Sequence, residues 1–374
     1  MGMMTESAMK WMVVAACWML AGGLQCGQAG AALLDGLMTP LEERLAERGE
    51  NVIVGNFYAP DRADAHGPIG MVGEHTHNKG EFMFTYRYMH MAMEGMRNGT
   101  NRLANSDVLQ RFTATPTNMA MDMHMFMPMY GLTDTVTVMA MVPYSTKSMD
   151  HLTRPGGTFT TESNGVGDVQ LFGLVRLYAI ETPSIGSHRF HLNLGLNIPT
   201  GSITERGLTP QGTVRLPYPM QLGSGTVDFL PGITYQGSAG DVSWGTQFMY
   251  NARTGRNSED YSLGNSWFLT GYGAYQWADW VSSSVRLNYQ DWDNISGRDL
   301  ALANPAMQMV PTVDPRLQSG QRLDVLVGFN LLFPEIMGLE NRLGVEAGMP
   351  IYQRLNGPQL ETDWVVYAGW QVVH

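Results

Sequence analysis

Methionine and histidine side chains crowd the first half of the chain in a pattern that could bind a soft metal ion. Of the 28 methionines, 15 lie between Met71 and Met149. Six of these alternate with other residues from Met119 to Met129, so on a strand they would share one face. Repeated thioethers with imidazoles nearby suit Cu(I) or a similar soft ion. The candidate metal ligands are His75, His77, His90, His124, Met123 and Met125.

Two further interpretations of the methionines stay open. Methionine is a flexible apolar filler, and we favour this packing role over a metal ladder. Methionine and aromatic side chains could instead line an apolar conduit for a hydrophobic small molecule. The pair His75 and His77, with Glu74 beside it, could chelate an ion from one strand face, but a polar periplasmic turn is the favoured interpretation. No cofactor is therefore predicted, and copper is kept as an alternative.

Composition excludes several classes of protein. The 374 residues are 44% hydrophobic and only 15% charged, and they include 43 glycines. The formal net charge of −11 argues against nucleic acid as a partner, because phosphate binding needs a basic face. The sequence has no nucleophile elbow, no zinc-protease motif and no phosphate loop. We therefore expect no enzyme and no catalytic residues, with an outer-membrane lipase as a minor alternative.

The N-terminus has the layout of a secretory signal peptide. An apolar run follows Lys10 but is too short to span a membrane, and Ala29-Gly30-Ala31 matches a cleavage site. Cys17 and Cys26 would both leave with this segment, so the mature chain would carry no thiol. We expect the protein to be exported to the periplasm or the outer membrane of a Gram-negative bacterium.

Beyond the signal, a short helix is predicted over residues 39–49, capped by Thr39 and stopped by Gly49. It could be a small plug, although a periplasmic lead-in is the favoured interpretation. The predicted organisation is a signal peptide over 1–31, a periplasmic N-terminal segment over 32–79, and a barrel over 80–374.

Apolar and polar residues alternate along many long segments. From Phe190 to Ile198, for example, the even positions are apolar and the odd positions are His191, Asn193, Gly195 and Asn197. Alternation over 9 to 11 residues is what a tilted strand needs to cross a bilayer. Twelve such segments are predicted near 80–94, 119–131, 135–145, 166–180, 188–200, 225–237, 241–254, 267–278, 280–292, 322–333, 341–354 and 362–373.

The connections between these segments alternate between short turns and long loops rich in Gly, Pro and Asn. Short periplasmic turns and long extracellular loops are typical of a bacterial outer-membrane barrel. The sequence therefore predicts an all-β protein, an antiparallel transmembrane β-barrel of about 12 strands. Aromatic residues near the strand ends and a C-terminal strand resembling the barrel assembly signal, with His374 in place of the usual aromatic, agree with this. The expected partners are outer-membrane lipid and the barrel-assembly machinery.

The polar parity of each strand is expected to face the lumen. Glu81 and Arg87 share their parity with Met89, which puts the methionines of that strand inside. The segment 119–131 is ambiguous, because a lumen position for Asp122 and His124 would send its six methionines to lipid. The lumen-facing candidates are Arg87, Met89, Met91, Met93, Met139, Met141, Asp168, Arg176, Asp228, Arg286, Asp324 and Glu346. Their mixed charges predict pairing across a tight or plugged interior.

Several local motifs resemble a known family. They lie at Gly73–Glu81, Met119–Met125, Met149–His151, Gly165–Asp168 and Tyr218–Thr226. They are similar to a group of outer-membrane transporters filed with the phenol meta-pathway degradation proteins, over roughly residues 70–374. The resemblance implies a barrel distantly similar to long-chain fatty-acid and aromatic-hydrocarbon channels.

We therefore expect an outer-membrane channel or transporter for a small, hydrophobic or aromatic solute. The alternative is a soft-metal binding or transport barrel that uses a Met and His ladder with copper. A structural barrel is a further minor alternative.

Overall fold

The computed structural model describes residues 43, 53–54, 62–183, 185–302, 309–336 and 338–374. The predicted signal peptide, and the predicted helix near 39–49 apart from residue 43, lie outside the described residues. Among the described residues, no helix is both long enough and apolar enough to cross a bilayer.

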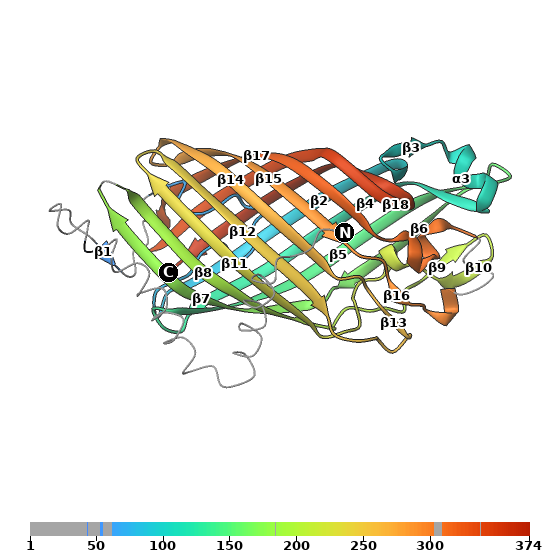
Figure 1. Ribbon diagram of the computed structural model, residues 1–374, viewed down its shortest axis with the longest axis horizontal. Helices are drawn as coiled ribbons and strands as arrows, with labels where there is room; N and C mark the ends of the chain where they lie inside the picture. The colour runs from blue at the N-terminus through green and yellow to red at the C-terminus, as the bar shows by residue number, and fades with distance from the viewer. Residues whose placement is uncertain (1–42, 44–52, 55–61, 184, 303–308, 337) are drawn as a thin grey trace.

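Eleven strands form a closed antiparallel barrel, which confirms the predicted fold class (Figure 1). Each strand pairs with the next in sequence, and the barrel closes where the last strand pairs with the first and where β5 pairs with β7. The wall consists of β2 (Phe82–Gly99), β4 (Ala114–Gly131), β5 (Val136–Thr153), β7 (Val169–Thr182), β8 (Gly186–Ile198), β11 (Asp228–Ala239), β12 (Val242–Arg253), β14 (Ser266–Ala278), β15 (Val281–Trp292), β17 (Gly320–Ile336) and β18 (Leu339–Val373).

The last strand supplies two passes of the wall. The first half of β18 pairs with β17 and its second half, from Leu355 onward, pairs with β2. The Gln353 side chain bonds to the backbone of Thr362, and Trp370 donates its ring N–H to Asn341. The two halves therefore lie side by side and antiparallel, so the 35 residues of β18 account for both predicted segments at 341–354 and 362–373.

The two ends of the barrel differ as the sequence predicted. At the periplasmic end, short turns join β4 to β5, β7 to β8, β11 to β12, β14 to β15 and β17 to β18, and β1 (Ile53–Val54) pairs with β7 there. The opposite end carries long loops with small elements (Figure 1). These are β3 (Asn101–Leu103), α3 (Asn105–Arg111), β6 (Thr158–Val166), β9 (Arg206–Thr209), β10 (Gly212–Arg215), η1 (Tyr218–Met220), β13 (Tyr261–Ser262), β16 (Ser296–Gly297), η2 (Leu300–Leu302), η4 (Pro311–Val313) and η5 (Pro315–Leu317).

Some strands run further than predicted. β2, β4 and β5 each have 18 residues, more than the 9–11 that a tilted strand needs to cross a bilayer. The extra residues lie at the loop end, where β5 goes on to pair with β6 beyond its pairing with β7. Backbone pairing among the loops therefore extends the wall above the membrane.

Side-chain burial separates an outer apolar face from an inner polar one. In β15, Val285 and Leu287 are 53% and 48% exposed, whereas Arg286 between them is 4% exposed. The same alternation leaves Phe329 and Val345 exposed on neighbouring strands. An apolar band around a closed barrel is suited to lipid, since a closed sheet has no unpaired edge strand. The protein is thus a barrel of the Gram-negative outer membrane.

Candidate functional site

The N-terminal part of the described chain, residues 62–80, runs inside the barrel and is called the plug below. The plug enters at the periplasmic end, where the amide of Ala63 donates to the carbonyl of Asp279 and the hydroxyl of Ser282 donates to the carbonyl of Ala63. It returns to the same end, where the amide of Gly80 donates to the carbonyl of Gly131. The prediction that 32–79 lies in the periplasm is therefore wrong for residues 62–79. A polar lumen needs hydrogen-bond partners, and this segment provides them.

Polar side chains of the wall hold the backbone at the apex of the plug. The carbonyl of Gly73 accepts from Asn193 Nδ2 at 2.7 Å and lies 2.9 Å from His191 Nε2. Gln247 Nε2 donates to the carbonyl of Val72 at 2.9 Å, and Arg87 donates to the carbonyl of Met71. These bonds come from β2, β8 and β12, so the apex is fixed from several sides of the lumen.

The predicted lumen charges all lie on the inner face, and most are paired there. Arg286 of β15 forms a bidentate pair with Glu346 of β18, with both N–O distances 2.7 Å. Asp228 pairs with Arg253 of the next strand, and Arg322 Nε lies 2.9 Å from Asp324 Oδ1. Arg176 instead donates to the hydroxyl of Thr76 in the plug, at 2.9 and 3.0 Å. Charge pairing therefore fills the lumen rather than lining an open pore.

The inner face of β4 carries all six alternating methionines. Met119, Met125, Met127 and Met129 are buried, whereas Phe126 and Tyr130 of the other parity are 42% and 43% exposed. The buried methionines of β2 and β5, Met89, Met91, Met139 and Met141, face them from the two neighbouring strands. One side of the lumen, formed by β2, β4 and β5, is thus lined by thioethers.

Asp122 and His124 lie on the outer face of β4, which resolves the ambiguity of that strand. Asp122 accepts from the Tyr88 hydroxyl and lies 2.8 Å from His90 Nδ1. The ring of His90 packs on Trp364, with ring centroids 4.8 Å apart. Partners on the next strand, near the loop end of the wall, allow these polar groups to face outward. The polarity of a side chain therefore did not predict its face here.

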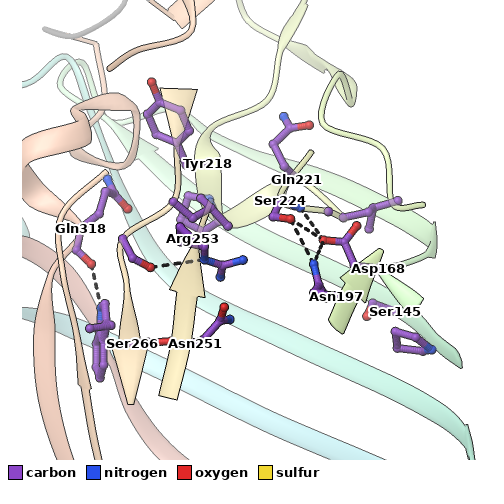
Figure 2. Close-up of a pocket in the computed structure, with 18 of the residues that line it drawn as sticks. Ser145, Asp168, Asn197, Tyr218, Gln221, Ser224, Asn251, Arg253, Ser266 and Gln318 are labelled. Atoms are coloured by element: carbon purple, nitrogen blue, oxygen red, sulfur yellow. Dashed lines mark hydrogen bonds between the residues drawn. The ribbon is translucent and has the colours of Figure 1, made fainter. Parts of the chain in front are cut away.

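A cavity of about 460 Å³ lies at the mouth of the barrel, lined by wall strands and extracellular loops (Figure 2). Its apolar lining includes Met121, Met123 and Met141 of the thioether side, with Tyr218 and Leu222 from a loop. Its polar lining includes Ser145, Lys147, Asp168, Asn197, Gln221, Ser224, Asn251, Arg253, Ser266 and Gln318. The cavity can therefore contact both apolar and polar parts of one small solute.

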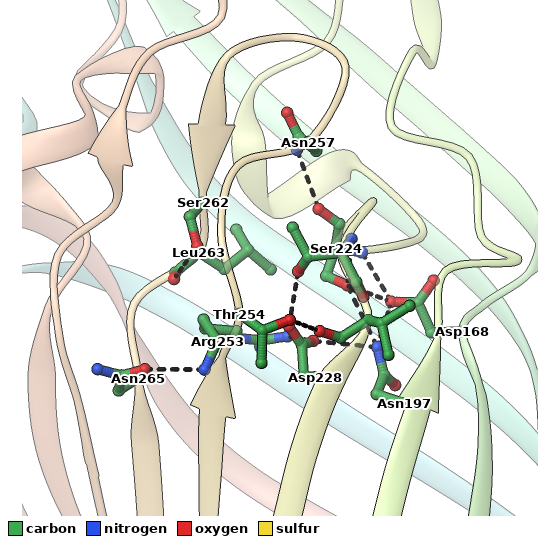
Figure 3. Close-up of polar contacts among 12 residues, drawn as sticks. Asp168, Asn197, Ser224, Asp228, Arg253, Thr254, Asn257, Ser262, Leu263 and Asn265 are labelled. Atoms are coloured by element: carbon green, nitrogen blue, oxygen red, sulfur yellow. Dashed lines mark hydrogen bonds and ion pairs between the residues drawn. The ribbon is translucent and has the colours of Figure 1, made fainter.

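The loop that carries Tyr218–Thr226 folds inward over this cavity and is anchored to the wall (Figure 3). Asp168 accepts from the amide and the hydroxyl of Ser224, at 2.8 and 2.7 Å. Asn197 Nδ2 donates to Asp168 at 2.8 Å, and Asn257 Nδ2 donates to the carbonyl of Ser224 at 2.9 Å. Lys147 Nζ donates to two carbonyls of the same loop, those of Pro219 and Gln221. The loop thus forms the roof of the cavity.

Tyr218 contributes a buried phenol to this roof. Tyr218 lines the cavity, and burial raises the pKa of its phenol above the ordinary value. The backbone amide of Asp299 donates to its hydroxyl oxygen at 3.1 Å.

Comparison with known proteins rests on structure alone. A scan against protein-family models finds no match, and no curated protein is significantly similar in sequence. The COG4313 outer membrane channel from Pseudomonas putida F1 aligns with a TM-score of 0.53 and 12% identity, over 81% of this chain and 98% of that chain. The chain shares the fold of that channel. The resemblance drawn from the sequence, to an outer-membrane barrel, is confirmed at the level of fold.

Two further outer-membrane proteins align less closely. A Pseudomonas aeruginosa FadL homologue has a TM-score of 0.37 and 9% identity, over 86% of this chain and 98% of that chain. The CymD monoaromatic hydrocarbon channel has a TM-score of 0.32 and 8% identity, over 79% of this chain and 88% of that chain.

The structure does not bring the six predicted metal ligands together. His90 and His124 face outward from the wall, Met123 and Met125 face the lumen, and His75 and His77 lie in the plug. The two plug histidines are instead joined by His66, which the sequence pattern did not single out because it lies nine residues from His75. Lys147 at the mouth carried no local signal. Asn197 and Ser224 were noted only for strand alternation and as part of the Tyr218–Thr226 motif, and it is the inward fold of the loop that brings them together.

Proposed function

We propose that the protein is an outer-membrane channel that admits a small, uncharged, hydrophobic or aromatic solute along the thioether side of its lumen. The plug closes the lumen in the conformation described. The observation that carries the proposal is a continuous row of methionines from the mouth to the periplasmic end. The fold of the Pseudomonas putida channel supports a transport role for a barrel of this shape.

The row of methionines runs from the mouth past Val72 of the plug to the periplasmic end. Near the mouth, Met121, Met123 and Met141 line the cavity. Below it, Met89, Met125 and Met127 pack in one cluster with Val72 of the plug, and towards the periplasmic end Met83, Met129 and Met139 pack in a second cluster against the same valine. Methionine side chains are flexible and polarizable, so they can repack around a passing apolar molecule.

The two sides of the plug are held in different ways. On the polar side, Gln247 and Asn193 bond to backbone carbonyls of the plug. On the thioether side, Val72 meets methionines through apolar contact alone in the two clusters. The strands of this side do bond the plug on either side of Val72, since Arg87 donates to the carbonyl of Met71 and the amide of His77 donates to the Thr137 hydroxyl. Val72 itself has only apolar neighbours in the two clusters, and we expect the solute to pass between it and the methionines.

Catalysis is the less supported alternative. Three serines line the cavity, Ser145, Ser224 and Ser266. The hydroxyl of Ser224, in the roof, is bonded to Asp168 and to the carbonyl of Thr226. These contacts fix the loop. We therefore assign Ser224 a structural role in the channel.

Solute uptake by outer-membrane vesicles tests this proposal. Vesicles with lipopolysaccharide in the outer leaflet would be loaded with the protein and exposed to a radiolabelled monoaromatic hydrocarbon. The variant Met123→Gln/Met125→Gln places two amides in the row, each of which costs about 1–2 kcal/mol when it is desolvated by an apolar solute. We expect uptake to fall by about tenfold or more.

The matched control is Met349→Gln, because Met349 is 57% exposed on the outer face. This variant should take up the hydrocarbon as the wild type does. Equal uptake by both variants and the wild type, or no uptake above empty vesicles, would contradict the proposed function.

A further inference from the structure

Three histidines and a glutamate converge inside the plug, where the mouth cavity and the methionine row do not reach. His66, Glu74, His75 and His77 are all buried, at 1–5% exposure. The candidate donor atoms of His66, Glu74 and His75 lie within 4.8 Å of one another. Nothing in the proposed channel mechanism uses these side chains. Buried ionisable groups without such a use call for a separate explanation.

The arrangement joins the two arms of the plug. His66 comes from the rising arm, and Glu74 and His75 come from the returning arm. Glu74 Oε1 lies 2.9 Å from His75 Nδ1 and 3.5 Å from His66 Nδ1. The rings of His66 and His75 meet edge to face, with centroids 4.2 Å apart. One carboxylate oxygen is thus shared by two imidazole nitrogens.

The Nδ1 atom of His75 faces the shared carboxylate, and in one of the two ring tautomers it is a free ligand atom. It is buried and close to Glu74, yet among the described residues it makes no aligned hydrogen bond. The other ring nitrogen, Nε2, lies 3.0 Å from His77 Nε2. When His75 donates its Nε2 proton to His77, its Nδ1 carries a lone pair directed at the shared site. Histidine ligands of metal ions are commonly fixed by such a bond at the second nitrogen.

The spacing of the donor atoms and their types, nitrogen and oxygen, favour a divalent ion of intermediate softness such as Zn²⁺. Imidazole and carboxylate ligands hold Zn²⁺ at about 2.0–2.2 Å, so donor atoms in a tetrahedral site lie about 3.3 Å apart. The observed separations need only small side-chain rotations to reach this. The methionine row lies elsewhere, along the wall. The sulfur of Met71 in the plug lies near Gly67 and the Cγ atom of Glu74, but the three converging donors are nitrogen and oxygen, a set that does not match a Cu(I) ladder.

We propose that the plug contains a binding site for a divalent transition-metal ion of the Zn²⁺ or Cu²⁺ type, with His66, Glu74 and His75 as ligands and His77 as the residue that orients His75. The ion clips the seven residues from Gly67 to Gly73 into a closed loop. The apex of this loop is the part that Asn193, Gln247 and Glu346 hold. The ion therefore stabilises the folded plug.

The local charge is compatible with a cation. Glu74 contributes one negative charge at the centre of the site, and Glu81, whose Oε2 lies 3.5 Å from His77 Nδ1, contributes a second at its edge. Two fixed cations lie close by, and both bond to backbone carbonyls of the plug. Arg87 acts electrostatically on Glu74 and bonds to the carbonyl of Met71, and Arg342 bonds to the carbonyls of His66 and Gly67. A divalent ion bound here is balanced by the two carboxylates.

Calorimetric titration with Zn²⁺ tests the site. The full-length protein, purified in detergent and stripped with a chelator, would be titrated with Zn²⁺ alone and, in a second arm, with Cu²⁺ alone. We expect one ion per chain, and at least about tenfold weaker binding after His75→Asn or after His66→Asn. The control is His90→Asn, which removes an outward-facing histidine and should leave the affinity unchanged. Heat-dependent migration on gels shows which variants retain the folded barrel.

X-ray absorption of the loaded protein identifies the ligands independently of the variants. The proposal expects a first shell of nitrogen and oxygen at about 2.0–2.2 Å with imidazole scattering. A first shell that contains sulfur would place the ion on the methionines and overturn the proposal. The absence of binding to the folded wild type would overturn it, as would equal weakening by the His90 control. None of these results bears on hydrocarbon uptake, which tests the channel separately.

Discussion

Arg286 and Glu346 form a bidentate ion pair inside the barrel, although their strands, β15 and β18, are not neighbours. β17 lies between the two strands, and Arg286 is opposite Leu326 while Glu346 is opposite Gly328. The Glu346 carboxylate also accepts from the amide of Gly70 at 3.2 Å. The pair therefore links β15 to β18 across the inner wall and also holds the plug at Gly70.

Removing the charge of Glu346 should weaken both the contact across the inner wall and the contact with the plug. In Glu346→Gln the buried guanidinium of Arg286 loses its charged partner, and breaking a buried pair in this way costs about 3–5 kcal/mol. We expect a lower denaturant midpoint, measured by tryptophan fluorescence of the folded barrel, and a higher single-channel conductance. Glu335→Gln is the control, because Glu335 is exposed at the periplasmic end of β17. A conductance equal to the wild type would mean that Glu346 does not seat the plug.

Gly70 should tolerate no side chain at the apex of the plug. A methyl group at this position would overlap the Arg286 guanidinium and the Glu346 carboxylate, which hold each other in place. We expect Gly70→Ala to cost about 1–3 kcal/mol through overpacking and to raise conductance by displacing the apex. Gly173→Ala is the matched control, since a methyl group there meets no atom within 4 Å. Similar conductance of both variants would show that the apex adapts to the added methyl group.

Much of the barrel followed from the alternation of residue types, because a lipid-facing parity must be apolar. Arg286 between Val285 and Leu287 is the typical case, and the strand boundaries near the periplasmic turns agree with the pattern. The rule that the polar face lines the lumen did not assign the faces of β4, because Asp122 lies on one face and the six methionines lie on the other. Its assumption of a polar interior is untrue on the side formed by β2, β4 and β5, which packs against Val72 of the plug.

The plug and the mouth were harder to predict for a different reason. Residues 62–80 have no periodic pattern, because their backbone is held by side chains of the wall and not by a strand partner. The contacts of Ser224 with Asp168 and of His66 with His75 depend on how loops and arms fold back, which local spacing does not encode. The sequence therefore predicted the frame, while the candidate sites arise from non-periodic segments placed within it.

The roof of the cavity should open when Asp168 loses its charge. The carboxylate accepts from the amide of Gly201 at 3.0 Å and from both the amide and the hydroxyl of Ser224. In Asp168→Asn one of these donors faces an amide NH₂ group, at a cost of about 1–3 kcal/mol. We expect faster tryptic cleavage at Arg206 or Arg215, measured by mass spectrometry. Asp241→Asn, at an exposed periplasmic turn, should leave the cleavage rate unchanged.

The outward-facing Asp122 should stabilise the wall through hydrogen bonds rather than through its charge. Its partners are the Tyr88 hydroxyl and His90, beside Trp364 near the loop end. Asp122→Ala leaves both partners without an acceptor next to lipid, which we expect to cost about 1–3 kcal/mol of unfolding free energy. Asp122→Asn keeps an oxygen acceptor and should cost less than half as much. Both would be measured by denaturant unfolding in phospholipid vesicles. If the alanine variant proves as stable as the wild type, lipid headgroups or water satisfy Tyr88 and His90, and the cluster contributes nothing to the stability of the barrel.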